Sequence, residues 1–299
     1  MSSILNRLEK NPQEVKRLIG IDLSQLEKLL AQAELLYNQK SQELEAQKTR
    51  IIKKGGGRKI KLCTKEQIIL TLIYLRHAVT FQLLGIQFGI SESAANYIFH
   101  RWLPIIIEVL PASVLEQVKK SESDTEFLTE ILAQVQLIVD SCEQARERPS
   151  DYQSQKKFYS GKKKTHTMKN QVIVLPNGKD IVDVVAGQPG PKSDINIFRE
   201  GKNKLAASQK FSGDKAYQGE PQITTPQKKS KGVTLTLSEL EKNKQLSKTR
   251  VKVEHIIRLV KTFKVAGERF RLDCQNYEQV ILAICGLVRL RINALILAK

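Results

Sequence analysis

Residues 250–261 read RVKVEHIIRLVK, a stretch with the pattern of an amphipathic helix and an unusual polar face. On a helix of 3.6 residues per turn, Arg250, Glu254 and Lys261 fall at roughly 0°, 40° and 20°, so one acid and two bases share a narrow stripe. The apolar residues occupy the opposite arc, at roughly 180° to 340°, as in a helix that packs inward on one side. They are Val253, Ile256, Ile257, Leu259, Val260 and Phe263. A carboxylate flanked by cations suits a metal ion beside phosphates, and the alternative is a solvated face with one i,i+4 ion pair.

Size and charge limit what such a site could act on. The chain has 299 residues, enough for one large domain or two small ones. Its 49 Lys and Arg against 31 Asp and Glu give a formal net charge of +18. This excess indicates a polyanionic partner, with nucleic acid ahead of a membrane surface. The four cysteines are far apart and form no C-x2-C pair, so we expect free thiols and no zinc site.

Membrane insertion and secretion are disfavoured by the same sequence. No run of about 18 or more apolar residues occurs, which argues against a spanning helix. The N-terminus, MSSILNRLEKNPQEV, lacks the apolar segment of a signal peptide. We therefore expect a cytoplasmic protein, associated with the nucleoid if its partner is DNA, with no membrane partner.

The N-terminal part of the sequence predicts helices and a DNA-reading motif. Residues 1–50 read as helix, which could pack on the body of the protein or pair with a second copy. Residues 51–61, IIKKGGGRKIK, break the helix and read as a basic linker or arm. Thr80 then caps a short helix, Gly89 makes a turn and Ser91 caps a second helix. The exposed side of that second helix is predicted to hold Glu92, Ser93, Asn96, His100 and Arg101. This pattern favours a helix-turn-helix, and an ordinary helical hairpin is the alternative.

From residue 134 the pattern changes from helix to strand. AQVQLIVDS predicts a buried strand that ends at Asp140, and QKFSGDKAYQG predicts another that ends at Asp214. Between them, HTMKNQVIVLPNGKDIVDVVAG predicts a hairpin that turns at Pro176–Gly178, and SDINIFREGKNKL a helix with Ser193 or Asp194 near its cap. Two helices follow, one centred on Glu254 and one over about 276–298. The order of elements predicts a mixed sheet covered by helices, an α+β or α/β catalytic domain. We divide the chain into a helical segment (1–50), a basic arm with the helix-turn-helix (51–131) and the catalytic domain (132–299).

Three acids stand out in this arrangement. Asp140 and Asp214 lie at predicted strand ends and Glu254 on a covering helix, so their carboxylates can converge on one point. Such hard oxygen ligands suit Mg²⁺ or Mn²⁺. Two such ions about 3.5–4 Å apart stabilise both the attacking and the leaving oxygen of a phosphodiester displacement. For any one acid, the alternative is a helix cap or a surface ion pair.

A basic stretch lies between the first two acids. Residues 156–169 read KKFYSGKKKTHTMK, with six lysines and no acid. The stretch includes Lys162, Lys163 and Lys164, interleaved with Phe158, Tyr159 and His166. Cations contact phosphates and aromatic rings stack on unpaired bases, so this stretch predicts a DNA contact. The alternative is a solvated loop before a strand.

Five pieces of the sequence, in this order, resemble the DDE transposases of bacterial insertion sequences related to PIF/Harbinger elements. They are VDSCEQARERP (139–149), FYSGKKKTHTMKNQVIV (158–174), GQPGPKSDINIF (187–198), SGDKAYQG (212–219) and NKQLSKTRVKVEHIIRLVKTFK (243–264). The resemblance covers roughly residues 60–290 and includes the helix-turn-helix.

The resemblance implies an RNase H-like core in which Asp140, Asp214 and Glu254 form a metal-dependent triad, with two Mg²⁺ or Mn²⁺ ions as cofactors. Arg250 and Lys261 match the basic partners of an R-x3-E-x6-K signature. That signature has a tyrosine three residues before the arginine, where this chain has Ser247. Asp194 is a further acid in a family motif, which we interpret as a cap or as a support for the metal ligands, and the alternative is that Asp194 joins the metal site.

The implied function is a cut-and-paste transposase whose partner is double-stranded DNA. The N-terminal helices would recognise the terminal inverted repeats of the element, and the metal site would serve the first nick and then strand transfer into target DNA. We expect a homodimer in the active complex. The alternatives are a metal-dependent endonuclease without transposition and a DNA-binding regulator with a dead catalytic core, which the intact triad disfavours. A basic membrane-surface protein ranks last, because no basic amphipathic helix with an aromatic-rich apolar face occurs.

Overall fold

The computed structural model describes residues 4–47, 61–120, 125–228, 235–295 and 297. The helices of the N-terminal half are α1 (Ile4–Lys10), α2 (Pro12–Leu18), α3 (Leu23–Ala46), α4 (Thr64–His77), α5 (Phe81–Phe88), α6 (Glu92–Val109), α7 (Val114–Lys120) and α8 (Thr125–Ala133). Apart from Lys61, the predicted basic arm at 51–61 lies outside the described residues.

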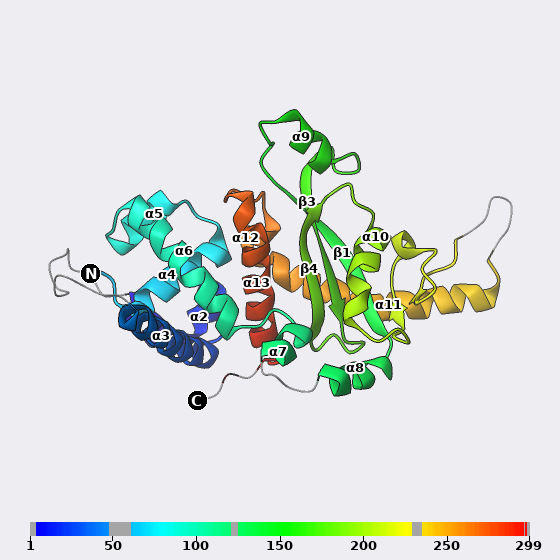
Figure 1. Cartoon of the computed structure of the whole chain (residues 1–299), viewed down its shortest axis with the longest axis horizontal. Helices are drawn as coiled ribbons and strands as arrows, with labels where there is room; N and C mark the ends of the chain where they lie inside the picture. Colours follow the sequence, from blue (N-terminus) through cyan, green and yellow to red (C-terminus); the bar gives the residue numbers. More distant parts are fainter. Residues whose placement is uncertain (1–3, 48–60, 121–124, 229–234, 296, 298–299) are drawn as a thin grey trace.

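The second half of the chain contains the sheet and the helices that cover it (Figure 1). Its strands are β1 (Leu137–Ala145), β2 (Tyr159–Ser160), β3 (Thr165–Val174), β4 (Ile181–Pro189), β5 (Phe211–Ser212) and β6 (Ile223–Thr224). Its helices are α9 (Tyr152–Phe158), α10 (Asp194–Gly201), α11 (Leu237–Lys261), α12 (Lys264–Gly267) and α13 (Tyr277–Arg291), with short 3-10 turns η1 (Lys202–Lys204), η2 (Lys215–Tyr217) and η3 (Cys274–Asn276).

The helix-turn-helix forms where the sequence predicts it. The Thr80 hydroxyl accepts a hydrogen bond from the Leu83 backbone N–H and so caps α5. Gly89 ends α5 in the left-handed conformation at φ +66°, which glycine adopts without strain. Ser91 caps α6 by accepting from the Ala94 N–H.

The sheet is mixed, in the order β2-β3-β1-β5-β6 with β4 on the other side of β3. The strands β1, β3 and β4 pair antiparallel, whereas β5 runs parallel to both β1 and β6. The predicted hairpin joins β3 to β4, with Gly178 in its turn at φ +68°. The expected combination of a helical N-terminal region with a mixed sheet is therefore confirmed.

Three predicted boundaries are wrong. The strand β1 continues past Asp140 to Ala145, because the polar residues after Asp140 pair with β3 as far as Thr167. The strand before Asp214 is only two residues long, and Asp214 itself caps η2. The last helix, α13, ends at Arg291 and not near residue 298.

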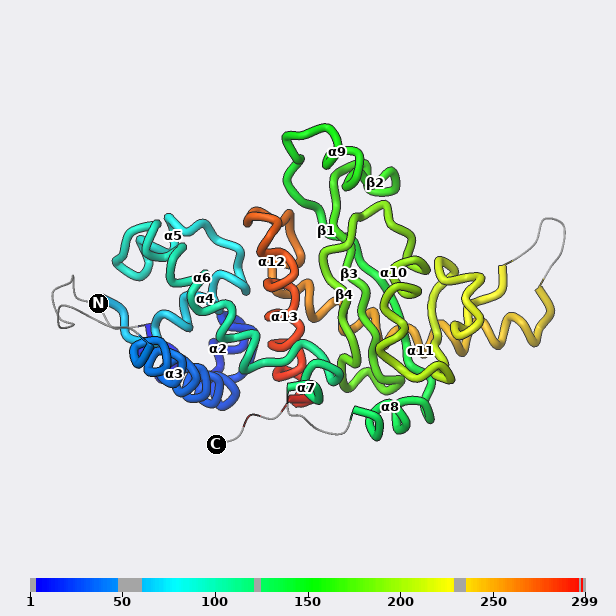
Figure 2. The backbone as a smooth tube through the Cα atoms, viewed as in Figure 1, coloured from blue at the N-terminus to red at the C-terminus, as the bar shows by residue number. Residues whose placement is uncertain are grey.

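Side-chain alternation along β1 divides the core into two parts. Ile138 belongs to the larger part, which lies under α11 and α13, whereas Leu137 and Val139 belong to a smaller part under α10. The larger part also contains Leu29 of α3 and Trp102 of α6. One hydrophobic core therefore runs from the N-terminal helices through α13 to the sheet (Figure 2).

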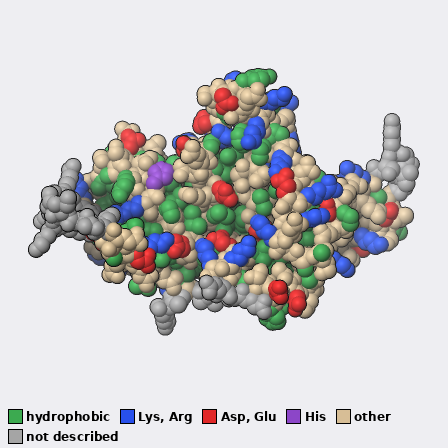
Figure 3. All heavy atoms as spheres, in the orientation of Figure 1, with side chains coloured by type: hydrophobic (Ala, Val, Ile, Leu, Met, Phe, Trp, Pro, Cys, Tyr) green, Lys and Arg blue, Asp and Glu red, His purple; other side chains and the backbone are tan. Residues whose placement is uncertain are grey.

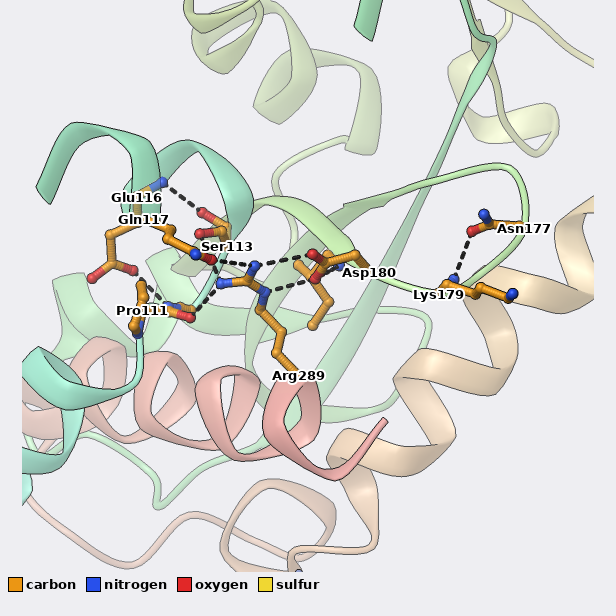
Figure 4. Close-up of polar contacts among 10 residues, drawn as sticks. Pro111, Ser113, Glu116, Gln117, Asn177, Lys179, Asp180 and Arg289 are labelled. Carbon is orange, nitrogen blue, oxygen red and sulfur yellow. Dashed lines mark hydrogen bonds and ion pairs between the residues drawn. The ribbon is translucent and has the colours of Figure 1, made fainter. Parts of the chain in front are cut away.

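A buried arginine joins the helical region to the sheet (Figure 4). Arg289 of α13 is 1 % exposed, and its Nε and Nη2 lie 2.6 and 3.0 Å from the two carboxylate oxygens of Asp180, in the β3–β4 turn. Its Nη1 donates to the carbonyls of Pro111 (2.8 Å) and Ser113 (3.0 Å), and Nη2 also donates to the Gln117 side chain. The guanidinium thus satisfies the carbonyls before α7 and holds the hairpin against α13.

No single helix among the described residues is long and apolar enough to cross a membrane. The pair α6 and α7 passes such a test by length and composition when taken together, although the two helices are bent by 87°.

Candidate active site

A polar pocket of about 280 Å³ lies on an open edge of β1. The strand β1 pairs with β5 only through Leu137 and Ile138. Within the described residues, the β5-facing edge of β1 has no paired strand from Asp140 until the Phe270 N–H donates to the Ala145 carbonyl at 2.8 Å. Residues on both faces of the sheet reach this edge. The pocket is lined by the acids Asp140, Glu143, Asp194 and Glu254 and by the cations Lys162, Lys163, Lys169 and Lys261, with Ser141, Cys142 and Ile257 between them.

The three predicted acids come from β1, the segment after β5, and α11. The parallel register places Ser212 beside Ile138, and Asp214, two residues past the end of β5, is close enough for its charge to raise the pKa of Asp140. Glu254 lies on α11, which packs across β1 with Val253, Ile256 and Ile257 buried beneath it. Asp214 does not line the pocket, because its Oδ1 accepts a hydrogen bond from the Ala216 N–H at 2.8 Å.

The electrostatics of Asp140 show that these acids influence one another. Burial raises the pKa of the Asp140 carboxyl to about 6. The Ser141 backbone N–H and Arg250 act in the opposite direction, whereas the negative charges of Asp214 and Glu254 raise the pKa further. Ionised Asp140 is therefore costly in the protein alone, and a bound cation would remove that cost.

A divalent cation fits the chemistry of this pocket, but the carboxylates are not gathered into a finished coordination shell. Within the described ranges, no three His, Cys, Asp or Glu side chains are close enough together to hold one ion. Mg²⁺ needs oxygens at about 2.0–2.1 Å from the ion, and several carboxylates gather around one point only when a cation offsets their repulsion. The donors are hard oxygens, which Mg²⁺ and Mn²⁺ prefer.

The basic partners of Glu254 occupy two different environments. The Arg250 guanidinium lies 3.5 Å from Glu254, with side chains 19 % and 54 % exposed, respectively. Arg250 is thus more buried than an exposed stripe implies, and its Nε is buried without a hydrogen-bond partner. Lys261 is exposed and lines the pocket. The i,i+4 ion pair is therefore present, and Arg250 itself does not line the pocket.

The structure adds a buried ion pair that the sequence did not single out. Lys169 of β3 is buried, and its Nζ lies 2.9 Å from Asp194 Oδ1 and donates to the Lys192 carbonyl at 2.6 Å. Asp194 Oδ1 makes no well-directed hydrogen bond, so charge attraction alone links it to the lysine. Asp194 is the first residue of α10 after its cap Ser193, as the sequence predicted, and it also lines the pocket. The available signal was that Lys169, unlike Lys162, Lys163 and Lys164, falls inside a predicted strand.

The DNA-binding candidates are distributed over two regions. Lys162 and Lys163 line the pocket, and Lys164 follows in the same turn at φ +54°. On α6, Asn96 and His100 are partly buried, and so is Arg101. Its guanidinium stacks over the Tyr37 ring of α3 at 4.5 Å. The exposed aromatic residue of α6 is Tyr97, at 65 %, which the sequence analysis did not single out.

Comparison with known proteins identifies the family. Residues 139–289 match the family model of a DDE superfamily endonuclease, and residues 61–112 match the helix-turn-helix of DDE superfamily endonucleases. The chain belongs to the DDE superfamily endonucleases. The catalytic match contains every acid and cation that lines the pocket.

This DDE endonuclease was also compared with individual proteins of known description. The chain is 32% identical over 224 residues to a protein described as a probable transposase for insertion sequence element IS702 of Microchaete diplosiphon, covering 73% of this chain and 77% of that one. Among solved structures, the Mos1 transposase paired-end complex with the left transposon end matches 58% of each chain at 13% identity, with a TM-score of 0.16. A likeness that weak carries no argument about the fold.

Family membership establishes the chemistry in outline. The protein is an enzyme of the transposase and nuclease class, its family generally uses divalent metal ions, and its helix-turn-helix is the type that accompanies a DDE endonuclease domain.

Proposed function

We propose that this DDE endonuclease is a transposase that cuts DNA at the terminal inverted repeats of an insertion sequence and joins the freed ends to target DNA. The observation that carries the proposal is the pocket on the open edge of β1. There, Asp140 and Glu254 face Lys162, Lys163 and Lys261, so acids that suit metal ions and cations that suit phosphates share one cavity. Because the substrate is bacterial DNA, we expect the protein to act in the cytoplasm.

The proposed roles follow from the position of each side chain. Asp140, Asp214 and Glu254 would hold Mg²⁺ or Mn²⁺, with two ions as the arrangement that we favour. Bound ions of this kind supply charge stabilisation at the attacking and leaving oxygens. Lys261 and Arg250 would hold the phosphate, and Lys162 and Lys163 would hold the neighbouring backbone. The Lys169 ion pair would keep Asp194 and the start of α10 against the pocket.

We propose a division of labour between the two halves of the chain. Residues 51–131 would recognise DNA and residues 132–299 would cut it. The two family matches, at 61–112 and 139–289, support this division. The active complex would contain two copies, so that both ends of the element are cut and joined together.

The test is an assay that scores cleavage and joining separately. The substrate is a labelled duplex carrying the inverted repeats that flank the gene, with supercoiled plasmid as the target and Mg²⁺ or Mn²⁺ present. A transposase produces nicked ends and then products joined to plasmid. Cleavage without any joined product would identify an endonuclease that cannot transpose. DNA binding without cleavage in either metal would identify a regulator.

Lys261→Ala is expected to slow joining by roughly 100-fold and to leave the melting temperature nearly unchanged, because it removes a donor to the reacting phosphate from an exposed position. A single-turnover joining assay beside a melting curve makes the measurement. The matched control is Lys264→Ala, one turn further along, whose ion pair with Glu268 is exposed and outside the pocket. A large drop in melting temperature with normal joining would show that Lys261 is structural.

Asn96→Ala is expected to lower the preference for terminal repeats over random DNA by roughly 5- to 100-fold, since an amide that reads a base edge contributes to discrimination and not to general affinity. Competition binding with the two duplexes measures this ratio. Replacing Lys53 and Lys54 of the basic arm should instead weaken binding to both duplexes equally and make the affinity less dependent on salt concentration. Equal losses on both duplexes in the Asn96 variant would contradict its role as a reader.

A further inference from the structure

A short ribbon beyond the main sheet presents two aromatic rings side by side. We define the ribbon as residues 159–166, comprising β2, its turn and the start of β3, next to the projecting helix α9 (Figure 2). Tyr159 lies directly opposite His166 in the antiparallel register. Their side chains therefore share one face of the ribbon, with ring centroids 5.5 Å apart in an edge-to-face arrangement at 69°.

The Tyr159 ring is available for a partner, unlike its neighbour. Tyr159 is 46% exposed. Phe158, in contrast, packs against the core, and its ring lies 4.4 Å from the Arg146 guanidinium. The molecular surface around α9 shows apolar, basic and acidic side chains (Figure 3). Burial and the cations of Arg148 and Arg146 lower the pKa of His166, so its imidazole is a neutral ring at neutral pH.

The turn of the ribbon brings cations to the catalytic pocket. Lys162 and Lys163 are exposed and line the same cavity as Asp140 and Glu254. Lys162 and Lys163 lie in the turn that joins the two strands of the ribbon, three residues from Tyr159 and from His166, respectively. A DNA strand whose phosphate is held at the lysines would therefore place a nearby base over the rings.

We propose that Tyr159 and His166 form a stacking platform for an unpaired DNA base next to the phosphate held at the pocket. The inference rests on the proposed function, since it requires DNA in that pocket. Inside a duplex the faces of a base are covered by its neighbours, so an exposed aromatic face gains contact only where the strand is locally open. Stacking tolerates any base, so the platform selects an open strand and not a sequence.

The experiment compares two labelled oligonucleotides of the same arbitrary sequence, one fully paired and one forked with unpaired bases at one end. Fluorescence anisotropy of the full chain in EDTA measures binding without cleavage. The wild-type protein should bind the fork more tightly. Tyr159→Ala should weaken binding to the fork at least about fivefold and leave binding to the paired duplex unchanged, because one base loses its stacking partner.

Two further variants define the contact. Tyr159→Phe keeps the ring without the hydroxyl and should bind the fork like the wild type. Tyr152→Ala removes another exposed aromatic residue, at 73%, from the start of α9 and outside the ring pair, and should also bind normally. Melting curves of each variant confirm that the fold is kept, which is expected for a surface position.

Three results would overturn the platform. They are unchanged fork binding in Tyr159→Ala, an equal loss on both DNAs, and a loss in Tyr159→Phe as large as in Tyr159→Ala, which would show a hydroxyl contact to the backbone. If the wild-type protein cuts and joins DNA and the variants give any of these results, the platform alone is refuted. A wild-type protein that binds neither DNA refutes the proposed function as well.

Discussion

Asp140→Asn and Asp214→Asn are each expected to abolish metal-dependent DNA cleavage while DNA binding survives. Each change keeps the shape of the side chain and removes the charge that a divalent ion needs. The negative charge of Asp214 raises the pKa of Asp140, so the two carboxylates are close enough to act on one another. The measurement is cleavage of labelled element ends in Mg²⁺ and in Mn²⁺, with a gel-shift assay for binding.

Asp140→Asn should also stabilise the protein when metal is absent. The pKa of Asp140 in the folded state, about 6, lies above the ordinary value of 3.8. An acid whose pKa is higher in the folded state destabilises the fold when it is ionised. The full cost applies above about pH 6, and it disappears as the pH falls from 6 towards 3.8. Removing the charge should therefore increase the free energy of unfolding at pH 8 by about 1–3 kcal/mol. Thermal melting in EDTA measures this gain, and a clear loss of stability would contradict it.

Asp194→Asn tests whether Asp214 or Asp194 joins Asp140 and Glu254 in the metal site. Asp194 lines the pocket and is paired with Lys169, whereas Asp214 does not line it. If Asp214 is a metal ligand, its variant loses cleavage and the Asp194 variant keeps part of it. Normal cleavage by Asp214→Asn together with no cleavage by Asp194→Asn would show that Asp194 takes the place of Asp214 in the metal site.

Arg289→Met is expected to lower the free energy of unfolding by about 3–5 kcal/mol, because it leaves the Asp180 carboxylate without its partner and the Pro111 and Ser113 carbonyls without a donor. The methionine keeps most of the apolar stem, so the loss reports the guanidinium. Denaturant unfolding followed by circular dichroism measures it.

The controls for Arg289 use its partner and an exposed ion pair. The double variant Arg289→Met, Asp180→Asn should lose less than the sum of the single changes, since the neutral amide no longer needs a cation. Glu268→Gln, which breaks the exposed Lys264–Glu268 pair, should change the free energy of unfolding by about 0–1 kcal/mol. A change below about 1 kcal/mol for Arg289→Met would show that water replaces the guanidinium at little cost.

The elements that the sequence predicted well depend on local chemistry. The caps Thr80 and Ser91 and the left-handed Gly89 form because their hydrogen bonds and backbone angles involve neighbours within a few residues. The apolar arc of α11 is buried for a similar reason, since helical periodicity sets which side chains share a face. The sequence motifs of the family, in the correct order, could also be recognised from the sequence alone, and the match to the DDE endonuclease model confirms this resemblance.

The features that could not be predicted all depend on partners far away in the chain. The strand β1 continues through polar residues because β3 pairs with them, and the Arg101 guanidinium stacks on the ring of Tyr37 in α3. The Lys169–Asp194 and Arg289–Asp180 pairs likewise join residues whose proximity is created by packing. A sequence states which side chains can make such contacts, but burial and long-range pairing select among them, because only the folded chain removes water from one set of charges and leaves the others solvated.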